Sequence, residues 1–234
     1  MDKERLPRPT VEFRRELRAS QDLTKYWHLF LLKNDLGKPM PWPENKVESQ
    51  VLDLTDFFGK PGPIEVEIGC GKGGFLVDYT TLHPDLPFLA IENEASIAYH
   101  AASRIARRDH LPHARLVLGD AFYFLRDFLP QSCVQTFHMY FPDPWPKKRH
   151  HKFRLLKPAF LEVVRRAALP GALFHWGTDH AEYHEEASAF FAATPWLQMV
   201  DPDAPPTEGI QTNFEKKYRA QGKPIYRCVL RVQG

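Results

Sequence analysis

A short strand-like segment that breaks into a run of glycines constrains the fold of this chain more than any other feature. Ile64–Ile68 has the sequence Ile-Glu-Val-Glu-Ile, in which apolar and acidic residues alternate as in a strand. It leads directly into Gly69-Cys-Gly-Lys-Gly-Gly74, and residues 75–82 are suited to a helix. A strand, a glycine turn and a helix in this order predict the first unit of an α/β fold.

The alternation of strands and helices continues to the C-terminus. Further strands are predicted at 88–91, 114–118, 134–141, 172–176 and 226–232, and further helices at 95–108, 157–169 and 180–193. We therefore predict a doubly wound, mostly parallel α/β sheet. Most of the predicted strands end near a glycine or a carboxylate, and in such sheets ligands bind beyond the carboxyl ends of the strands.

Composition indicates a single core in a reducing compartment. Hydrophobic residues make up 43% of the 234 residues, and a chain of this length buries roughly 70% of its unfolded surface. Three widely spaced cysteines suggest neither a disulfide framework nor a metal site. No apolar run approaches the ~20 residues of a membrane span, and the N-terminus does not resemble a secretory signal. We expect a cytoplasmic protein, monomeric or homodimeric, with a partly flexible arm at 1–45 and one domain at 46–234.

The distribution of charge is more informative than its sum. The chain carries 31 Lys and Arg against 29 Asp and Glu, a formal net charge of +2, which does not indicate a polyanionic partner. Residues 147–157, however, hold six basic side chains and no acid, and residues 215–231 hold six against one acid. These two clusters predict phosphate-facing patches that the near-neutral total conceals.

The glycine turn admits two interpretations of its ligand. Gly69-x-Gly71-x-x-Gly74 matches the dinucleotide-binding pattern. The same turn also fits Glu67-x-Gly69-x-Gly71-x-Gly73, which suits S-adenosylmethionine. A third interpretation is purely structural, with glycines making a tight turn and the neighbouring acids capping helices.

The acidic side chains near the turn favour the second interpretation. Glu67 would repel the pyrophosphate of a dinucleotide but attract the ammonium and sulfonium of S-adenosylmethionine. Glu92, after the next predicted strand, is placed to accept both ribose hydroxyls, and Asp120 to read an adenine amino group. We therefore expect S-adenosylmethionine as the cofactor and no metal.

The segment Phe141-Pro-Asp-Pro-Trp-Pro-Lys-Lys-Arg149 is the second candidate for chemistry. Its three prolines fix φ and restrict their neighbours, which holds Asp143 and Trp145 on a stiff loop. A carboxylate and an indole on a rigid loop suit a flat, hydrogen-bonding base, and the basic residues that follow suit phosphate.

With these motifs in order, the chain resembles the bacterial tRNA (guanine-N7)-methyltransferase family, whose members have the seven-stranded, Rossmann-like class I fold and use S-adenosylmethionine. The resemblance covers residues 64 to the C-terminus and rests on these motifs: Glu67-Ile-Gly-Cys-Gly-Lys-Gly73, Ile91-Glu92, Gly119-Asp120-Ala121, Phe141-Pro-Asp-Pro-Trp-Pro-Lys147, Arg149-His-x-Lys152, Thr178-Asp179 and Thr212-Asn-Phe-Glu215. One departure is Phe153, where many members carry arginine, which weakens an expected phosphate contact.

The resemblance implies a role for each matching residue. It implies methyl transfer to N7 of a guanine in the tRNA variable loop, with Asp143 as the catalytic residue. Implied cofactor contacts are Glu67, Gly69, Gly71, Gly73, Glu92, Asn93, Asp120, Ala121 and Asp143. Implied contacts to tRNA are Lys147, Arg149, His150, Lys152, Arg154, Asp179, Thr212, Phe214 and Glu215. The alternatives are a nicotinamide-dependent oxidoreductase, which Glu67 opposes, and a non-catalytic RNA-binding module.

Overall fold

The computed structural model describes residues 27–29, 51–108 and 111–234 of the chain. The predicted N-terminal arm at 1–45 therefore lies outside the described residues, apart from Trp27–Leu29. Within the described part, no helix is both long and apolar enough to cross a bilayer.

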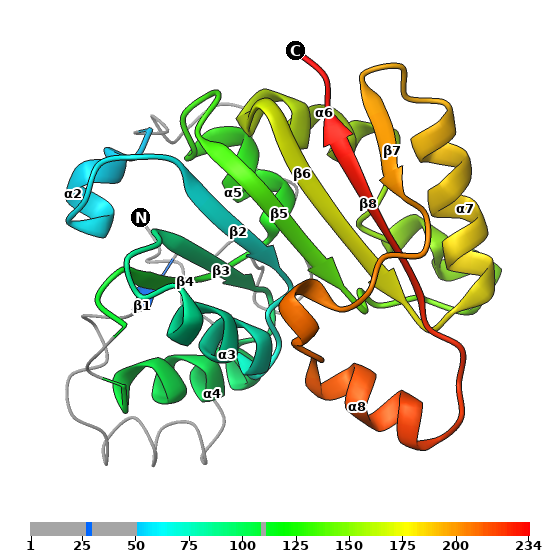
Figure 1. The fold of residues 1–234 in the computed structure, drawn as a ribbon, viewed down its shortest axis with the longest axis horizontal. Helices are drawn as coiled ribbons and strands as arrows, with labels where there is room; N and C mark the ends of the chain where they lie inside the picture. The colour runs from blue at the N-terminus through cyan, green and yellow to red at the C-terminus, as the bar shows by residue number, and fades with distance from the viewer. Residues whose placement is uncertain (1–26, 30–50, 109–110) are drawn as a thin grey trace, which may run out of the picture.

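A twisted sheet forms the centre of the molecule (Figure 1), and its eight strands lie in the order β1-β4-β3-β2-β5-β6-β8-β7. All pairings from β1 to β6 are parallel, whereas β8 runs antiparallel to both β6 and β7. The predicted seven-stranded, mostly parallel sheet is confirmed as β2 to β8, and the short β1 extends it beyond β4. The strands are β1 Trp27–Leu29, β2 Ile64–Ile68, β3 Phe88–Glu92, β4 Ala114–Leu118, β5 Val134–Tyr140, β6 Ala168–Thr178, β7 Leu197–Asp201 and β8 Tyr226–Val232.

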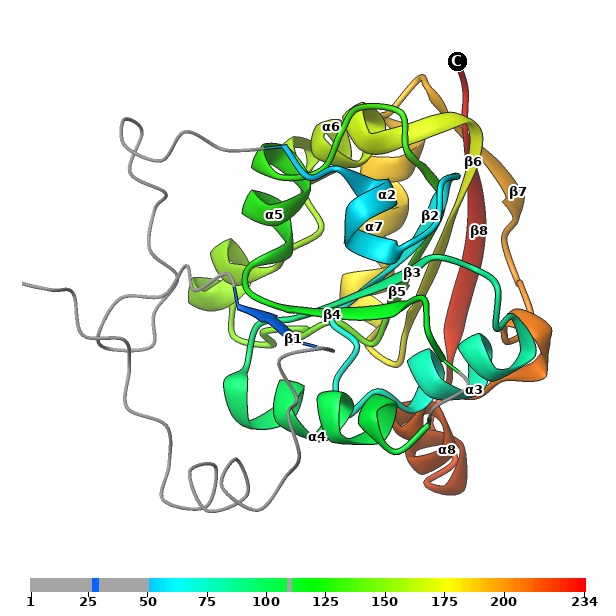
Figure 2. The ribbon, with the colours of Figure 1, turned by 90° about the vertical axis from the view of Figure 1, so that its left-hand side faces the viewer.

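Helices cover both faces of this sheet (Figure 2), as the doubly wound prediction requires. Helices α2, α5, α6 and α7 pack on one face and enclose the larger apolar cluster, while α3 and α4 pack on the other. The helices are α2 Leu54–Phe58, α3 Gly74–Leu82, α4 Ala95–Ala106, α5 Ala121–Asp127, α6 Pro158–Ala167, α7 Ala181–Ala192 and α8 Asn213–Ala220, with 3₁₀ helices η2 Lys148–Phe153 and η3 Thr207–Gly209.

The period-two pattern of the strands decides which side chains meet which helices. On β2, Ile64, Val66 and Ile68 join the larger apolar cluster. The two intervening glutamates point to the opposite face, where they are buried. The alternation that predicted this strand therefore also places two carboxylates on the α3 side of the sheet.

The chain reverses its direction of winding between β2 and β5. From β2 the chain proceeds outward through β3 to β4, and from β5 it proceeds the other way to β6. In open α/β sheets the crevice for ligands lies at the carboxyl ends of the strands beside such a reversal. Here those ends carry the glycine turn after β2 and the Pro-Asp-Pro-Trp loop after β5.

Seven elements of the structure were not predicted from the sequence: the strands β1 and β7, the helices α2, α5 and α8, and the 3₁₀ helices η2 and η3. The predicted boundary between α6 and β6 was also wrong. Pro170-Gly171, predicted to follow a helix directly, lies inside β6, where the register with β5 shifts. Gly171 has φ +82°, so it supplies the irregularity that lets an exposed proline sit within a strand.

Candidate active site

The glycine turn wraps closely around the end of β3. The backbone N–H of Gly69 donates to the Ile91 carbonyl at 2.8 Å, and that of Gly71 donates to Glu92 Oε2 at 2.9 Å. Gly73 has φ +70°, and a Cβ added there would lie 2.9 Å from Ala101 Cβ on α4. A Cβ added to Gly71 would meet no atom within 4 Å. The turn is therefore packed closely against α4 at Gly73 and leaves open space at Gly71.

Two carboxylates meet beneath this turn. Glu67 is 3% exposed, and its Oε2 has no hydrogen-bond partner among the described residues. Burial and the charge of Glu92 hold the pKa of Glu67 well above its usual value. Burial also raises the pKa of Glu92, against the effect of backbone N–H groups, and the charge of Asp143 raises it further.

This acidic turn suits a ligand that carries positive charge. A buried carboxylate oxygen without a partner costs free energy, and a bound cation would offset both that cost and the repulsion between the two glutamates. S-adenosylmethionine carries an ammonium and a sulfonium, so its charge fits. The pyrophosphate of a dinucleotide would add a third negative group to the same place.

The third predicted cofactor carboxylate also has a structural task. Asp120 begins α5, where its Oδ1 accepts a hydrogen bond from the Phe122 backbone N–H at 2.8 Å. Ala121 follows it as the buried first residue of α5, and Asn93 is exposed beyond β3. The helix-capping interpretation thus applies to Asp120.

The Pro-Asp-Pro-Trp loop leaves β5 in an unusual backbone conformation. Phe141 and Trp145 have φ of +53° and +43°, values that bulky side chains rarely adopt. The Phe141 backbone N–H donates to the Gly177 carbonyl of β6 at 2.7 Å, which fixes the start of the loop. Asp143 is exposed between these two points, and its charge acts on Glu92. The predicted catalytic carboxylate is therefore near enough to the acidic turn for its charge to act on Glu92.

Arg154 is a correction to the predicted phosphate-binding residues. Its guanidinium is buried, with Nη1 2.6 Å from Glu186 Oε2 and Nε donating to the Pro144 carbonyl at 2.8 Å. The guanidinium also lies over the Tyr183 ring, 4.8 Å from its centroid. A side chain that is 2% exposed and paired in this way fastens the loop to α7 and is not free to meet a phosphate.

The rest of the first basic cluster does face solvent. It forms the 3₁₀ helix η2, in which Lys148, Arg149 and Lys152 are exposed, with Lys147 just before it. His150 is half-buried and accepts a hydrogen bond from Arg149 Nε at 3.2 Å. The predicted tRNA contacts on this segment, except Arg154, thus share one exposed helix beside Asp143.

Half of the second basic cluster is paired within the fold: Arg219, Lys223 and Arg227 contact acids, whereas Lys216, Lys217 and Arg231 are exposed, and its role as a phosphate-facing patch stays a prediction. Glu215 is fully buried and forms ion pairs with Arg227 and with Arg219. Asp179 Oδ2 accepts from Lys223 Nζ at 2.9 Å. Both predicted substrate acids therefore have basic partners from α8 and the residues after it.

The Thr212–Glu215 motif begins α8. Thr212 is buried and its hydroxyl accepts a hydrogen bond from the Glu215 backbone N–H at 3.1 Å, as in a capping box. Asn213 lies against the glycine turn, since a Cβ on Gly74 would come 3.0 Å from its Nδ2. Phe214 is 48% exposed. Of this motif, Phe214 is thus the side chain most available to a substrate.

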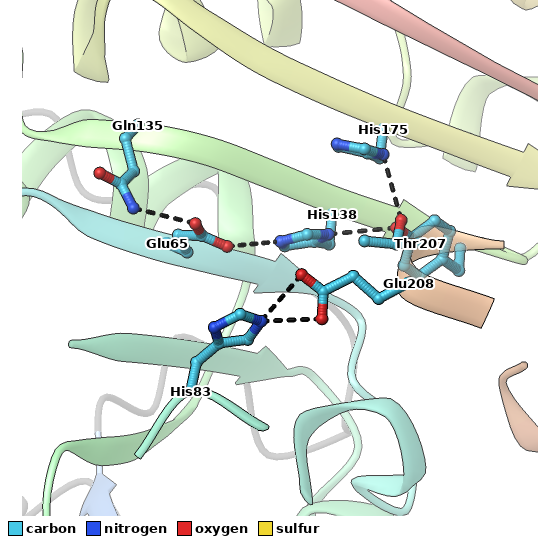
Figure 3. A network of polar contacts seen from close by, with 8 residues as sticks. Glu65, His83, Gln135, His138, His175, Thr207 and Glu208 are labelled. Carbon is cyan, nitrogen blue, oxygen red and sulfur yellow. Dashed lines mark hydrogen bonds and ion pairs between the residues drawn. The ribbon is translucent and has the colours of Figure 1, made fainter. Parts of the chain in front are cut away.

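A buried polar network, which the sequence analysis missed, holds the segment before α8 (Figure 3). Glu65 Oε2 contacts His138 Nε2 at 2.9 Å, and His138 Nδ1 contacts the Tyr140 hydroxyl at 3.1 Å. The Thr207 hydroxyl joins the Tyr140 hydroxyl at 2.6 Å and His175 Nδ1 at 3.1 Å. The signal for this network was a polar residue at every second position of β2 and β5, which sequence reasoning took only as strand alternation.

The neighbouring pair Glu208–His83 adds a second attachment, with 2.8 Å between Glu208 Oε2 and His83 Nε2 (Figure 3). Because Thr207 and Glu208 belong to η3, the two attachments fix this short helix to the sheet and to the residue after α3. The chain reaches Thr212 a few residues later, so the network positions α8 beside the glycine turn.

One cavity lies away from this site. A cavity of about 480 Å³ at the amino ends of the strands is lined by Lys60, Pro61, Gly62, Pro63, Leu82, His83, Pro84, Asp85, Leu86, Pro87 and Gln135, none of them a predicted site residue. Among the residues that the structure describes, no group of three or more His, Cys, Asp or Glu side chains is arranged to hold a metal ion.

Comparison with known proteins agrees with this geometry. A family model described as "Putative methyltransferase" matches residues 61–228. A protein of Halorhodospira halophila named tRNA (guanine-N(7)-)-methyltransferase is 34% identical over 201 residues, which cover 82% of this chain and 86% of that protein. A protein of Alkalilimnicola ehrlichii with the same name is 33% identical over 192 residues, covering 79% and 81%.

Solved structures with the same fold are more distant in sequence. The aminoglycoside resistance methyltransferase NpmB1 aligns with a TM-score of 0.56 and 18% identity, covering 78% of this chain and 94% of that one. The 16S rRNA methyltransferase KamB aligns with a TM-score of 0.59 and 14% identity, covering 79% and 95%. At these identities the likeness confirms the class I methyltransferase fold alone.

Proposed function

The chain belongs to the tRNA (guanine-N(7)-)-methyltransferase family, and we propose from that premise that it transfers a methyl group from S-adenosylmethionine to N7 of guanine 46 in the tRNA variable loop. The observation that carries the proposal is that Glu67 and Glu92 lie at the glycine turn and raise the local negative charge, that the charge of Asp143 acts on Glu92, and that the exposed basic helix η2 begins five residues after Asp143. An acidic centre next to a basic surface suits a cationic cofactor and a polyanionic substrate together.

The glycine turn and its carboxylates are the proposed cofactor site. S-adenosylmethionine, when bound, supplies an electrophilic methyl group on a positively charged sulfur. Glu67 and Glu92 favour positive charge at the turn, and the open space above Gly69 and Gly71 lets a ligand approach the backbone. We assign Asn93, Asp120 and Ala121 to the same site as contacts from the ends of the next two strands.

Asp143 is the proposed catalytic residue. Guanine N7 already presents an in-plane lone pair, so no proton has to leave before it attacks the methyl carbon. The Asp143 carboxylate accepts hydrogen bonds from the base, holds N7 in line for the attack, and stabilises the positive charge that develops on the purine ring. Orientation of this kind contributes several kcal/mol to lowering a barrier.

The basic helix is the proposed surface for tRNA phosphates. Lys147, Arg149, His150 and Lys152 lie on one short segment that follows Asp143 by only a few residues. We assign Phe214 to the contact with the substrate base, and Asp179, Thr212 and Glu215 to positioning of α8. We propose a cytoplasmic location, which the three free thiols of Cys70, Cys133 and Cys228 support.

Transfer of a labelled methyl group tests the proposal directly. The protein is incubated with labelled S-adenosylmethionine and bulk tRNA, and the product is digested to nucleosides. We expect N7-methylguanosine, and Asp143→Ala is expected to lose most methyl transfer while it still binds tRNA. Labelled N6-methyladenosine, or near-normal turnover of Asp143→Ala, would contradict the proposal.

The same preparation separates the two alternatives. A nicotinamide-dependent oxidoreductase would bind NAD in preference to S-adenosylhomocysteine in a calorimetric titration, whereas we expect the reverse. A non-catalytic RNA-binding module would bind tRNA without transferring any label.

A further inference from the structure

An exposed cluster of rings lies on the basic helix beside the proposed active site. The Trp145 and Phe153 rings have centroids 5.3 Å apart, and His150 lies 5.9 Å from the first and 6.0 Å from the second. Trp145 is 37% exposed and Phe153 is 51% exposed. We call these three residues the aromatic platform.

The structure holds the platform rigidly in spite of this exposure. Trp145 lies between two prolines with φ +43°, and the carbonyl of the preceding Pro144 accepts the hydrogen bond from the buried Arg154. Phe153 ends η2, one residue before Arg154. Large apolar rings that are fixed in solvent, in a backbone conformation rare for tryptophan, indicate a surface that is covered by a partner.

The charges around the platform indicate which partner covers it. Lys148, Arg149 and Lys152 are exposed on the same 3₁₀ helix, and Lys152 Nζ lies 5.2 Å from the Phe153 ring centroid. The cores of protein–protein interfaces are depleted in lysine. Aromatic rings within a positively charged surface are instead typical of proteins that stack unpaired bases and bind the adjoining phosphates.

The base on the platform is not the one that reacts. Asp143 acts electrostatically on Glu92 in the acidic turn, whereas the ring contacts of Trp145 are with His150 and Phe153 of η2. Only Pro144 separates Asp143 from Trp145, so their Cα atoms are at most about 7 Å apart. The platform therefore lies within reach of a nucleotide that adjoins the reacting one.

We propose that Trp145, His150 and Phe153 form a stacking site for an unpaired nucleobase of RNA next to the target guanine. This deepens the proposed function and rests on it, because it requires an RNA substrate whose target lies in a single-stranded loop. The stacking is tolerant of base identity, since every base presents a π-face.

Fluorescence of 2-aminopurine tests the proposal. The analogue is placed at each nucleotide that adjoins the target guanine in a tRNA transcript, and binding is measured with S-adenosylhomocysteine, so that no turnover occurs. We expect quenching by the wild-type protein at one of the two positions. Phe153→Leu is expected to lose this quenching and to weaken tRNA binding by roughly five-fold or more, whereas Phe153→Trp restores both.

Two controls separate stacking from other effects. Because Phe153→Leu removes no charge, the slope of log Kd against log salt concentration is expected to stay at the wild-type value. Met199 is an exposed apolar residue outside the platform, on β7. Met199→Ala is expected to leave the quenching and the Kd unchanged.

Several results would overturn the platform. These are quenching and affinity of Phe153→Leu equal to wild type, a changed salt slope, or sedimentation showing a wild-type dimer that Phe153→Leu abolishes. The last result would assign the rings to a second copy of the chain. Failure of the proposed function is distinct, because it would appear as absent N7 methylation by the wild-type protein while quenching still reports on the platform.

Discussion

Replacement of Arg154 by methionine decides whether this residue serves the fold or the substrate. The Arg154 side chain is 1% exposed and joins Glu186, Pro144 and the face of the Tyr183 ring. Methionine retains the unbranched aliphatic part of the side chain, so the change removes the guanidinium with little loss of packing.

The expected loss of unfolding free energy follows from the two groups that lose the guanidinium as a partner, the Glu186 carboxylate and the Pro144 carbonyl. Removing one partner of a buried ion pair costs about 3–5 kcal/mol when the other charge stays buried. The Glu186 side chain is 32% exposed, so water recovers part of its solvation and the cost falls below that range. The Pro144 carbonyl loses a charged donor, which adds about 1–3 kcal/mol. We expect Arg154→Met to lower the free energy of unfolding by about 2–4 kcal/mol, or Tm by roughly 5–15 °C.

Thermal unfolding and salt-dependent tRNA binding are the assays, with Lys152→Met as the matched control. Lys152 is exposed two residues away, so its loss is expected to change unfolding by less than about 0.5 kcal/mol. Its loss is also expected to reduce the salt slope of tRNA binding by roughly one phosphate contact. Arg154→Met is expected to do the opposite, with lower Tm and an unchanged slope. A wild-type Tm with a reduced slope would refute the burial argument and return Arg154 to the phosphate contacts.

Three further substitutions test the turn and the network. Glu67, whose pKa is raised by burial, favours the fold while protonated. Its own contribution to stability is complete below its usual pKa of 4.5 and is lost as pH rises through the raised pKa. Glu67→Gln is expected to remove this contribution to the pH dependence of unfolding measured from pH 4 to 9. Gly73→Ala, at φ +70° and 2.9 Å from a side chain of α4, is expected to cost about 2–4 kcal/mol in denaturant unfolding, and Gly71→Ala, with free space around it, about 1–2 kcal/mol. Thr207→Val removes one of the two partners of the Tyr140 hydroxyl, which keeps His138 Nδ1, and also removes the contact to His175 Nδ1. It is expected to lower the free energy of unfolding by about 1–3 kcal/mol, while Thr207→Ser stays near wild type.

Strand periodicity and glycine punctuation predicted six of the eight strands of the sheet and missed β1 and β7. The six strands located from the sequence are confirmed within a few residues, because buried strands and the turns that end them are both local features. Parallel strands bring their carboxyl ends to one edge, so the glycine turn after β2 and the loop after β5 lie at the same edge of the sheet, as the sequence predicted. The roles of Glu67 and Asp143 at that edge stay predictions.

The missed helices were short or had their signals assigned to another role. Helix α5 spans only Ala121–Asp127, and its start was marked by Asp120, which sequence reasoning assigned to the cofactor. Helix α8 begins with a threonine whose hydroxyl caps the backbone N–H of the glutamate three residues later, which is half of a capping box, while that glutamate's carboxylate pairs with Arg219 and Arg227. Sequence reasoning took those two residues as substrate contacts. The same local sequence can serve as a helix cap or as a substrate contact, and the burial of its side chains distinguishes the two roles.

The pairing of charges was not predictable because it depends on tertiary contacts. Glu215 meets Arg227 only because β8 returns beside β6 after α8. A count of six basic residues over 215–231 contains no information about that return. The cluster at 147–157 retains its exposed charge because η2 contains no acid and most of its basic side chains point into solvent.

The loop that carries Asp143 is anchored on both sides, and each anchor comes from a different part of the fold. On one side the Phe141 N–H binds the Gly177 carbonyl, beside the hydroxyl pair of Tyr140 and Thr207. On the other side Arg154 binds the Pro144 carbonyl from its buried position against α7. Because methyl transfer to an unprotonated ring nitrogen depends on alignment and not on proton removal, we infer that these anchors supply the rigidity on which the reaction relies. Loosening either anchor is therefore expected to lower kcat more than it weakens the binding of tRNA.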